Sequence, residues 1–323
     1  MGGFDYLRLI AAILVIVHHA RVLSGQPPLM LGPGLDPGAL GVGIFFVISG
    51  YLVAGSLERS AKITDFLAKR ILRIFPGLLV ALLLTAFALG PLVTTAGGYL
   101  RDPATWLYVL KNISLYAVTY QLPGVFLAAP IAGIVNGSLW TLRLEFTAYL
   151  GLTILGPLRR ALPLALESVM ALTAIAAIAL HATGLDGRGD LYRIGYLAAL
   201  NGFLFLAGAT LQANGTRPTA LEAIVALVFL LTPAWFLALP LAVVRLGQLK
   251  LPKPPGDISY GLYIYSFPLQ QWLAQTHHLS VATSIAATLP FAVLSWFLVE
   301  KPALRLKRRL SPAQLSPGAA AAD

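Results

Sequence analysis

The first apolar segment of the chain, residues 4–24, reads FDYLRLIAAILVIVHHARVLS. It has the length of about 20 residues that an α-helix needs to cross the hydrocarbon core of a bilayer. Arg21 follows its apolar core, where a cleavable signal peptide would carry small residues. We therefore expect a retained membrane helix. Ionisable side chains are costly at this depth and are usually functional, so those of this helix are the first candidates for a site.

Three ionisable side chains of this helix share one face. His19 follows Arg8 by eleven residues, which brings it to within roughly 20° of Arg8 around the helix. Asp5 precedes Arg8 by three residues and lies on the same face. His18 lies about 80° off this stripe, so we expect His19 to be the functional histidine. The helical rise separates Arg8 from His19 by about 16 Å, which puts them in opposite halves of the membrane.

The whole chain has the composition of a membrane protein. Of its 323 residues, 58% are hydrophobic and only 11% are charged, whereas about a quarter are charged in soluble domains. The chain has no cysteine, which excludes a disulfide, a thiolate nucleophile and an iron–sulfur cluster. No group of residues has metal-ligand spacing, so we expect no metal.

Ten apolar segments predict an all-α polytopic membrane protein with about ten transmembrane helices. The predicted helices are residues 4–24, 41–57, 71–95, 138–156, 163–182, 193–213, 219–232, 233–247, 258–276 and 279–299. The seventh and eighth are short and meet at Thr232-Pro233, so they form either a tight hairpin or one long kinked helix. The loop at residues 96–137 contains several aromatic residues, and we expect part of it to lie at the membrane interface or to re-enter the membrane.

Lys and Arg residues are distributed unequally between alternate loops. With the N-terminus in the cytoplasm, seventeen of the 23 fall in cytoplasmic loops and ends, and five fall outside. The positive-inside rule therefore predicts that both termini are cytoplasmic. These loops explain the net charge of +10, so we expect no nucleic-acid partner. We assign residues 1–302 to one transmembrane domain and residues 303–323 to a basic, then disordered, cytoplasmic tail.

Basic residues also mark the start of the third predicted helix, at Lys69, Arg70 and Arg73. Arg70 and Arg73 share a helix face because they are three residues apart. The planar fork of an arginine side chain suits phosphate oxygens. The alternative is that these residues only fix the topology, as basic residues do at the cytoplasmic ends of many membrane helices.

A polar segment opens the fourth predicted helix, running from Ser138 through Trp140 and Arg143 to Glu145. Arg143 and Glu145 are two residues apart and point in different directions, so they cannot pair with each other. Each needs a partner on another helix or a polar cavity. A buried structural ion pair is the alternative to a functional role.

Two further segments carry weaker signals. Tyr260 and Tyr263 open the ninth predicted helix and indicate an aromatic wall or an interface belt. The small residues around Ser49 indicate close helix packing rather than a nucleophile.

Six segments, taken together and in this order, resemble the acyltransferase-3 family of integral membrane O-acyltransferases. The matching segments are Arg8-x10-His19, Phe45-Phe46-Val47-Ile48-Ser49-Gly50-Tyr51, Arg70-x2-Arg73 with Phe75-Pro76, Ser138-Leu139-Trp140-Thr141-Leu142 through Glu145, Ser259-Tyr260-Gly261-Leu262-Tyr263, and Val299-Glu300-Lys301-Pro302. Ser266, Phe146 and Arg143 depart from the pattern of many members, which bears on the acceptor or the subgroup more than on the reaction.

The resemblance implies an enzyme that moves an acyl group, usually acetyl from acetyl-CoA, to a hydroxyl. The acceptor is typically a cell-surface or exported glycan. It also implies a bacterial cytoplasmic (inner) membrane, with the bilayer as partner and acyl-CoA as a co-substrate on the cytoplasmic side. The sequence leaves open whether the chain forms a homo-oligomer.

By the same resemblance, His19 and Arg8 are the essential pair, and Arg70 and Arg73 meet the coenzyme. Our hypothesis makes His19 the general base that receives the acceptor from outside. In this hypothesis Asp5 and Arg8 shape the coenzyme entrance, and Glu145 orients His19 from another helix.

Other residues complete the predicted site. Lys69 joins Arg70 and Arg73 at the coenzyme, while Ser138, Trp140, Tyr260 and Tyr263 are the expected substrate-binding residues. The main rival function is a transporter or flippase of a glycan or small molecule, because intramembrane charges and broken helices also mark transport paths. A structural subunit without chemistry is a second rival.

Overall fold

A computed structural model describes residues 2–306, and within that range the chain contains helices and no β-strand. The helices are α1 Gly3–Leu23, α2 Pro37–Glu58, α3 Ile63–Leu84, α4 Gly90–Val93, α5 Pro103–Ile113, α6 Trp140–Ala161, α7 Ala165–Ala182, α8 Asp190–Ala213, α9 Ala220–Phe229, α10 Trp235–Gly247, α11 Ser259–Gln275, α12 Val281–Ser295 and α13 Lys301–Leu306. π-helical turns at Thr85–Leu89 and Trp296–Glu300 join α3 to α4 and α12 to α13. Most of the predicted tail lies beyond residue 306, outside the described residues.

Each of the ten predicted segments coincides with a helix, which confirms the all-helical prediction. Residues 219–247 form two helices, α9 and α10, that pack against each other, so the hairpin alternative is correct. Six helical segments in the described range are long and apolar enough to cross a membrane. They are Gly3–Leu23, Pro37–Glu58, Ile63–Val93, Ala165–Ala182, Asp190–Ala213 and Val281–Leu306. The count of ten crossings and the side of each terminus stay predictions.

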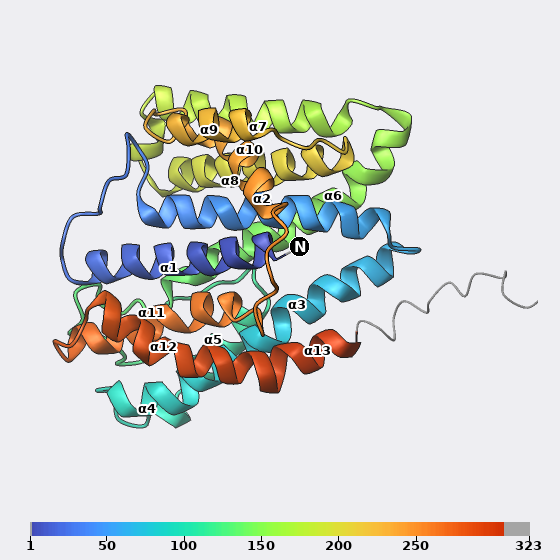
Figure 1. The fold of residues 1–323 in the computed structure, drawn as a ribbon. Coiled ribbons are helices and arrows are strands. Elements are labelled where there is room, and N and C mark those ends of the chain that lie inside the picture. Colours follow the sequence, from blue (N-terminus) through green and yellow to red (C-terminus); the bar gives the residue numbers. More distant parts are fainter. Residues whose placement is uncertain (1, 307–323) are drawn as a thin grey trace, which may run out of the picture.

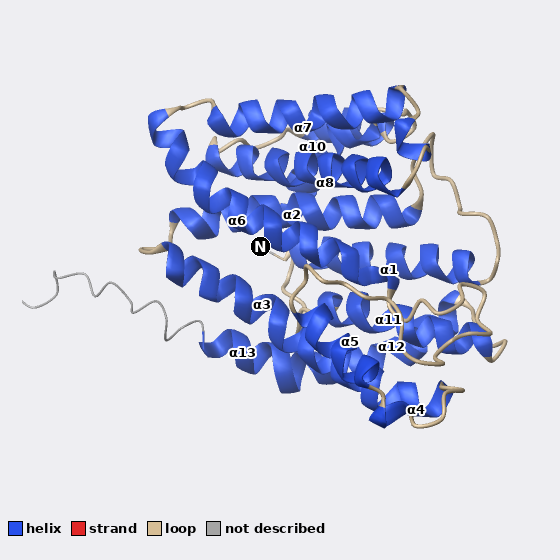
Figure 2. Ribbon diagram, turned by 180° about the vertical axis from the view of Figure 1, so that it is seen from behind, coloured by secondary structure: helices blue, strands red, loops and turns tan. Residues whose placement is uncertain are grey.

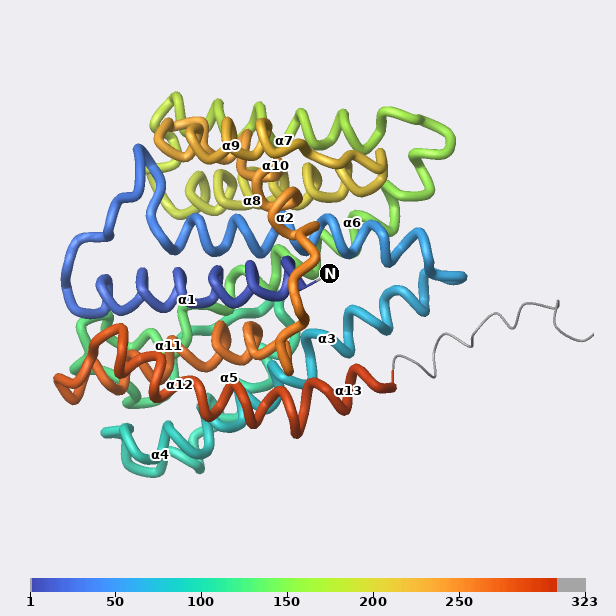
Figure 3. The backbone as a smooth tube through the Cα atoms, in the orientation of Figure 1, coloured from blue at the N-terminus to red at the C-terminus, as the bar shows by residue number. Residues whose placement is uncertain are grey.

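The bundle is built around α1 and α2, which are neighbours (Figure 1). One group of helices, α7 to α10, lies on one side of α2, and α11, α12 and α13 lie on the other side of α1. The view from behind shows the same two groups (Figure 2). The turns after α2 and α6 lie at the end of the bundle where α13 finishes, and the loops after α1 and α11 lie at the opposite end (Figure 3). We call the first of these the basic end, because Arg59, Lys62, Arg159 and Arg160 lie there.

Glycines allow α2 and α8 to approach closely at the centre of the bundle. A Cβ atom on Gly50 would lie 1.8 Å from the carbonyl oxygen of Phe205, and one on Gly208 would lie 2.3 Å from that of Val47. Both distances are far below van der Waals contact, so only glycine fits at these two positions. The small-residue packing expected around Ser49 is therefore present.

The loop at residues 96–137 contains a short helix, α5, that the sequence analysis did not identify. α5 packs on α3 and its Tyr108 is fully buried, whereas Trp106 and Leu110 are exposed. The helix therefore has a second apolar face, which is exposed. Tyr99 donates its hydroxyl hydrogen to the carbonyl of Ala86 in the π-helical turn. That bond satisfies a backbone acceptor of the irregular turn.

Candidate active site

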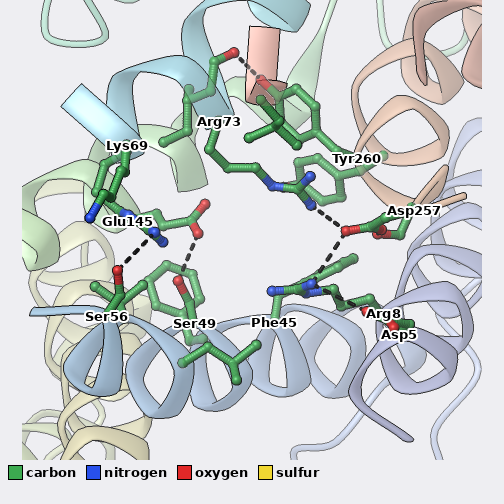
Figure 4. A pocket seen from close by; sticks show the side chains of 18 of the residues that line it. Asp5, Arg8, Phe45, Ser49, Ser56, Lys69, Arg73, Glu145, Asp257 and Tyr260 are labelled. Carbon is green, nitrogen blue, oxygen red and sulfur yellow. Dashed lines mark hydrogen bonds and ion pairs between the residues drawn. The ribbon is translucent and has the colours of Figure 1, made fainter. Parts of the chain in front are cut away.

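A cavity of about 1180 Å³ lies between α1, α2, α3, α6, α11 and the segment that joins α10 to α11 (Figure 4). Its wall contains six cations, which are Arg8, Arg59, Lys69, Arg70, Arg73 and Lys253. It contains three carboxylates, which are Asp5, Glu145 and Asp257. Arg59 and Lys253 are exposed and form its rim. A cavity with this excess of cations favours an anionic ligand.

Arg8 and Arg73 meet at one carboxylate. Oδ2 of Asp257 lies 2.6 Å from Nη2 of Arg73 and 3.2 Å from Nη1 of Arg8. Asp5 lies further from Arg8, at 3.8 Å. Burial opposes ionisation of Asp257, but the two guanidinium groups outweigh it and hold the pKa of this carboxyl well below its usual range. The predicted Asp5–Arg8 face thus lies in the cavity, with a partner that the sequence analysis did not identify.

The side chains of Lys69 and Arg70 have only neutral partners within hydrogen-bond distance in the described part of the chain. Lys69 is buried and donates to Oγ of Ser60 at 3.3 Å. Arg70 donates to Oγ of Ser56 at 3.3 Å, and its Nε has no hydrogen-bond partner among residues 2–306. Cations without a carboxylate partner retain most of their capacity for an anion.

Glu145 lies in the cavity wall with two hydroxyl groups. Ser49 donates to its Oε1 at 2.8 Å, and Tyr149 donates to the same oxygen. This contact satisfies the expectation that Glu145 needs a partner from another helix. Within the described residues Glu145 forms no hydrogen bond with His19, so the structure does not support its predicted role in orienting that histidine. The two side chains lie at different depths in the bundle. Glu145 is beside Ser49, which is eleven residues along α2 from Gly38, and Gly38 lies next to His18, the neighbour of His19 in the sequence.

His19 lies toward the other end of α1 and is not part of the cavity wall. Its ring meets the edge of Phe267 at 4.9 Å between centroids, and its Nδ1 is buried without a hydrogen-bond partner among the described residues. The gap between this histidine and the cavity is short. His19 packs on Phe267, and Tyr263, which lines the cavity, is about 6 Å from Phe267 along α11.

His18 has a carboxylate neighbour instead. Its Nδ1 lies 2.9 Å from Oδ1 of Asp36, the residue that caps α2. Burial opposes ionisation of Asp36, but the contacts with His18 and with the backbone N–H of Ala39 outweigh it and lower the pKa of this carboxyl. The two adjacent histidines therefore have different surroundings, as the helical stripe predicts.

The predicted substrate residues divide into two groups. Tyr260 and Tyr263 line the cavity, whereas Ser138 and Trp140 do not. The hydroxyl of Tyr263 lies 2.6 Å from Oγ1 of Thr141, and its ring meets that of Phe45 edge to face at 5.6 Å. Ser138 is buried behind this contact. These aromatic rings form the end of the cavity that is nearer to His19.

Sequence reasoning missed Asp257, Tyr149 and the rim cations. Asp257 lies two residues before the predicted Ser259-Tyr260 segment, in a loop where lysines and prolines precede it. An isolated acid among basic residues was the available signal. Residues 2–306 contain no group of three or more His, Cys, Asp or Glu side chains that could hold a metal.

The fold and the site together define a helical membrane protein with a basic cavity between its helices and a histidine beyond the inner end of that cavity. The chain belongs to the acyltransferase-3 family, because the family model described as "Acyltransferase domain" matches residues 1–219. It is therefore an integral membrane O-acyltransferase.

Several relatives match nearly the whole chain, and two of them also match over nearly their own full length. An "O-acetyl transferase" of Shigella phage Sf6 is 33% identical, and the match covers 96% of this chain and 97% of the relative. "Nodulation protein 10" of Rhizobium leguminosarum bv. viciae is 29% identical, with 98% and 96% covered. No solved structure matches the chain.

Proposed function

We propose that this enzyme transfers an acetyl group from acetyl-CoA to a hydroxyl of a cell-surface or exported glycan, with His19 as the general base. The single observation that carries this proposal is the basic cavity. It starts at exposed cations and ends at Tyr263, one turn of α11 from Phe267, the residue that packs on His19. The name of the phage relative, an O-acetyl transferase, supports acetyl as the transferred group.

The coenzyme part of the donor fits the charge of the cavity. Arg70 and Lys69 have no carboxylate partner within 4 Å in the described range, and Arg73 keeps N–H groups beyond the one it donates to Asp257. Guanidinium groups bind phosphate oxygens in pairs of hydrogen bonds. In our proposal these three residues and Arg8 hold the phosphates, with Asp5 at the entrance.

The apolar end of the cavity suits the pantetheine arm and the acyl group. Lining residues on α2 run from Arg59 to Val42, about 25 Å along the helix. Phe45 and Tyr263 form the inner end, next to the short gap before the histidines. An extended arm held along this path directs the thioester toward His19, and Ser138 and Trp140 then support the wall behind Tyr263 rather than contact the donor.

The chemical step needs one proton acceptor near the attacking hydroxyl. In our proposal a ring nitrogen of His19 takes the hydroxyl proton as the oxygen forms a bond to the thioester carbonyl carbon. The C–S bond then breaks, the acetyl ester remains on the acceptor, and the coenzyme leaves as a thiol after protonation. Glu145, which accepts hydrogen bonds from Ser49 and Tyr149, adds a negative charge to the cavity wall.

Cellular placement follows from the same proposal. The basic end faces the cytoplasm of a bacterial inner membrane, where acyl-CoA is available, and the acceptor meets His19 from outside. A transporter would need no thioester cleavage, which allows a direct test between the two functions.

The test measures coenzyme release by purified protein in liposomes that contain extracted glycan acceptor. A thiol reagent reports free CoA without protein background because the chain has no cysteine. We expect acceptor-dependent release, with the KM for acetyl-CoA raised about tenfold or more in a variant carrying Arg70→Gln and Arg73→Gln, since two phosphate contacts are lost. Arg160→Gln, at the exposed end of α6, is the matched control. Acetyl-CoA that stays intact with every acceptor fraction would exclude the proposed function.

A further inference from the structure

We propose that Asp257 is a positioning residue that holds Arg8 and Arg73 side by side for the phosphates of the donor. The inference rests on the proposed function and adds a residue to it, because neither the helical stripe of α1 nor the arginine pair of α3 includes this acid. Asp257 itself needs no contact with the donor.

The geometry places one carboxylate oxygen between two helices. Arg8 is on α1 and Arg73 is on α3, so the two guanidinium groups come from different helices. Asp257 comes from a third element, the segment before α11, and its Oδ2 accepts from both guanidinium groups. Figure 4 shows Arg73 reaching it from above and Arg8 from below. This carboxylate therefore determines how far apart the two cations lie.

Asp257 is itself held in place. Its other oxygen, Oδ1, accepts from the hydroxyl of Ser259 in the first turn of α11. Only 13% of its side chain is exposed. A carboxylate with both oxygens engaged is fixed in orientation, so it fixes the two guanidinium groups that bind to it.

Electrostatics gives the acid a function beyond packing. Two guanidinium groups that share a poorly solvated site repel each other, and the repulsion grows as the effective dielectric constant falls. Asp257 offsets this repulsion before the ligand arrives. Each arginine donates one N–H to it and keeps others of its five for a ligand. The result is a preorganised pair of donors from two helices, which suits a diphosphate.

The test compares Asp257→Asn and Asp257→Glu with wild type, using full-length protein in liposomes. We expect Asn to raise the KM for acetyl-CoA about tenfold while kcat changes less than twofold, because the donor phosphates lose a preorganised contact. Glu should recover most of this loss. Asp65→Asn is the matched control, since Asp65 is an acid on α3 that does not line the cavity. An unchanged KM in the Asn variant would overturn the proposal, as would an equal loss in kcat.

A second measurement separates this inference from the proposed function. If Asp257 offsets the repulsion between Arg8 and Arg73, Asp257→Asn should lower the Tm. Adding Arg73→Gln to this variant should restore part of the Tm, because it removes one of the two cations. A double variant less stable than Asp257→Asn alone would contradict the positioning function even if the protein transferred no acetyl group. Failure of acetyl-CoA cleavage in wild type would end the proposed function and leave this stability result to decide the inference.

Discussion

At the scale of single residues, Arg8 and His19 lie at different positions along α1 and have different proposed roles. Arg8 lies in the basic part of the cavity, and His19 lies beyond its aromatic end. The two belong to one helix face but to different surroundings, one polar and one apolar. The Nδ1 atom of His19 has no hydrogen-bond partner among residues 2–306, which is consistent with a base that awaits a hydroxyl partner.

His19→Ala should lower acetyl transfer by at least about a hundredfold, because general-base catalysis contributes this much or more. The affinity for CoA, measured by calorimetry, should change little since His19 does not line the cavity. His277→Ala, in an exposed loop, is the control for loss of a histidine. Transfer near the wild-type rate in the His19 variant would rule out the proposed base.

The pH dependence of stability tests the ion pairs of Asp257. Its pKa is lowered in the folded protein, so its contribution is complete above the ordinary value of about 4 and is lost as the pH falls through the lower folded value. The Tm difference between wild type and Asp257→Asn should therefore be constant from about pH 5 to about pH 8 and should shrink below about pH 4. Thermal unfolding followed by fluorescence would measure it. A difference that varied between pH 6 and 8 would show that another group controls these contacts.

At the scale of helices, the cavity depends on how α2 is positioned. α2 supplies Phe45 and Ser49 to the cavity wall on one side and packs without side-chain space against α8 on the other. α6 and α11 supply Glu145 and Tyr263. Neither helix belongs to the set of six long apolar segments, because α11 has only 17 residues and α6 contains the charged residues Arg143 and Glu145.

Gly50→Ala tests the α2–α8 contact. The new methyl group would overlap the carbonyl of Phe205, so α2 must shift, and we expect a loss of about 1–3 kcal/mol in stability with reduced activity. Gly151→Ala on α6 is the matched control, since a Cβ there meets nothing within 4 Å. It should be neutral or stabilising by up to about 1 kcal/mol. Equal melting temperatures for the two variants would show that the close contact is not required.

At the scale of the whole molecule, the sequence was most informative about helices and least about contacts. Apolar length predicted every long helix, and helical periodicity placed Arg8 and His19 on one face. The hairpin of α9 and α10 was one of two alternatives, because a Thr-Pro break fits either. The partners of Arg8, Arg73 and Glu145 could not be predicted, since they come from residues 257, 257 and 49, which are distant in the chain and meet only through tertiary packing.

Short helices were also hard to predict. α5 has only eleven residues and an apolar face too short for a membrane crossing, so its sequence indicated an interfacial or re-entrant segment without predicting the helix. The predicted link between Glu145 and His19 failed because periodicity gives the direction of a side chain but not the depth of a neighbouring helix.

The central proposal is that the donor binds from the basic, cytoplasmic end while transfer occurs toward the other face. Sealed membrane vesicles of both orientations, prepared from producing cells, test it when labelled acetyl-CoA is added outside. Acetyl-CoA does not cross the bilayer, so inside-out vesicles should incorporate label into glycan, and right-side-out vesicles should do so only after permeabilisation. Equal incorporation in intact vesicles of both orientations would contradict the proposal.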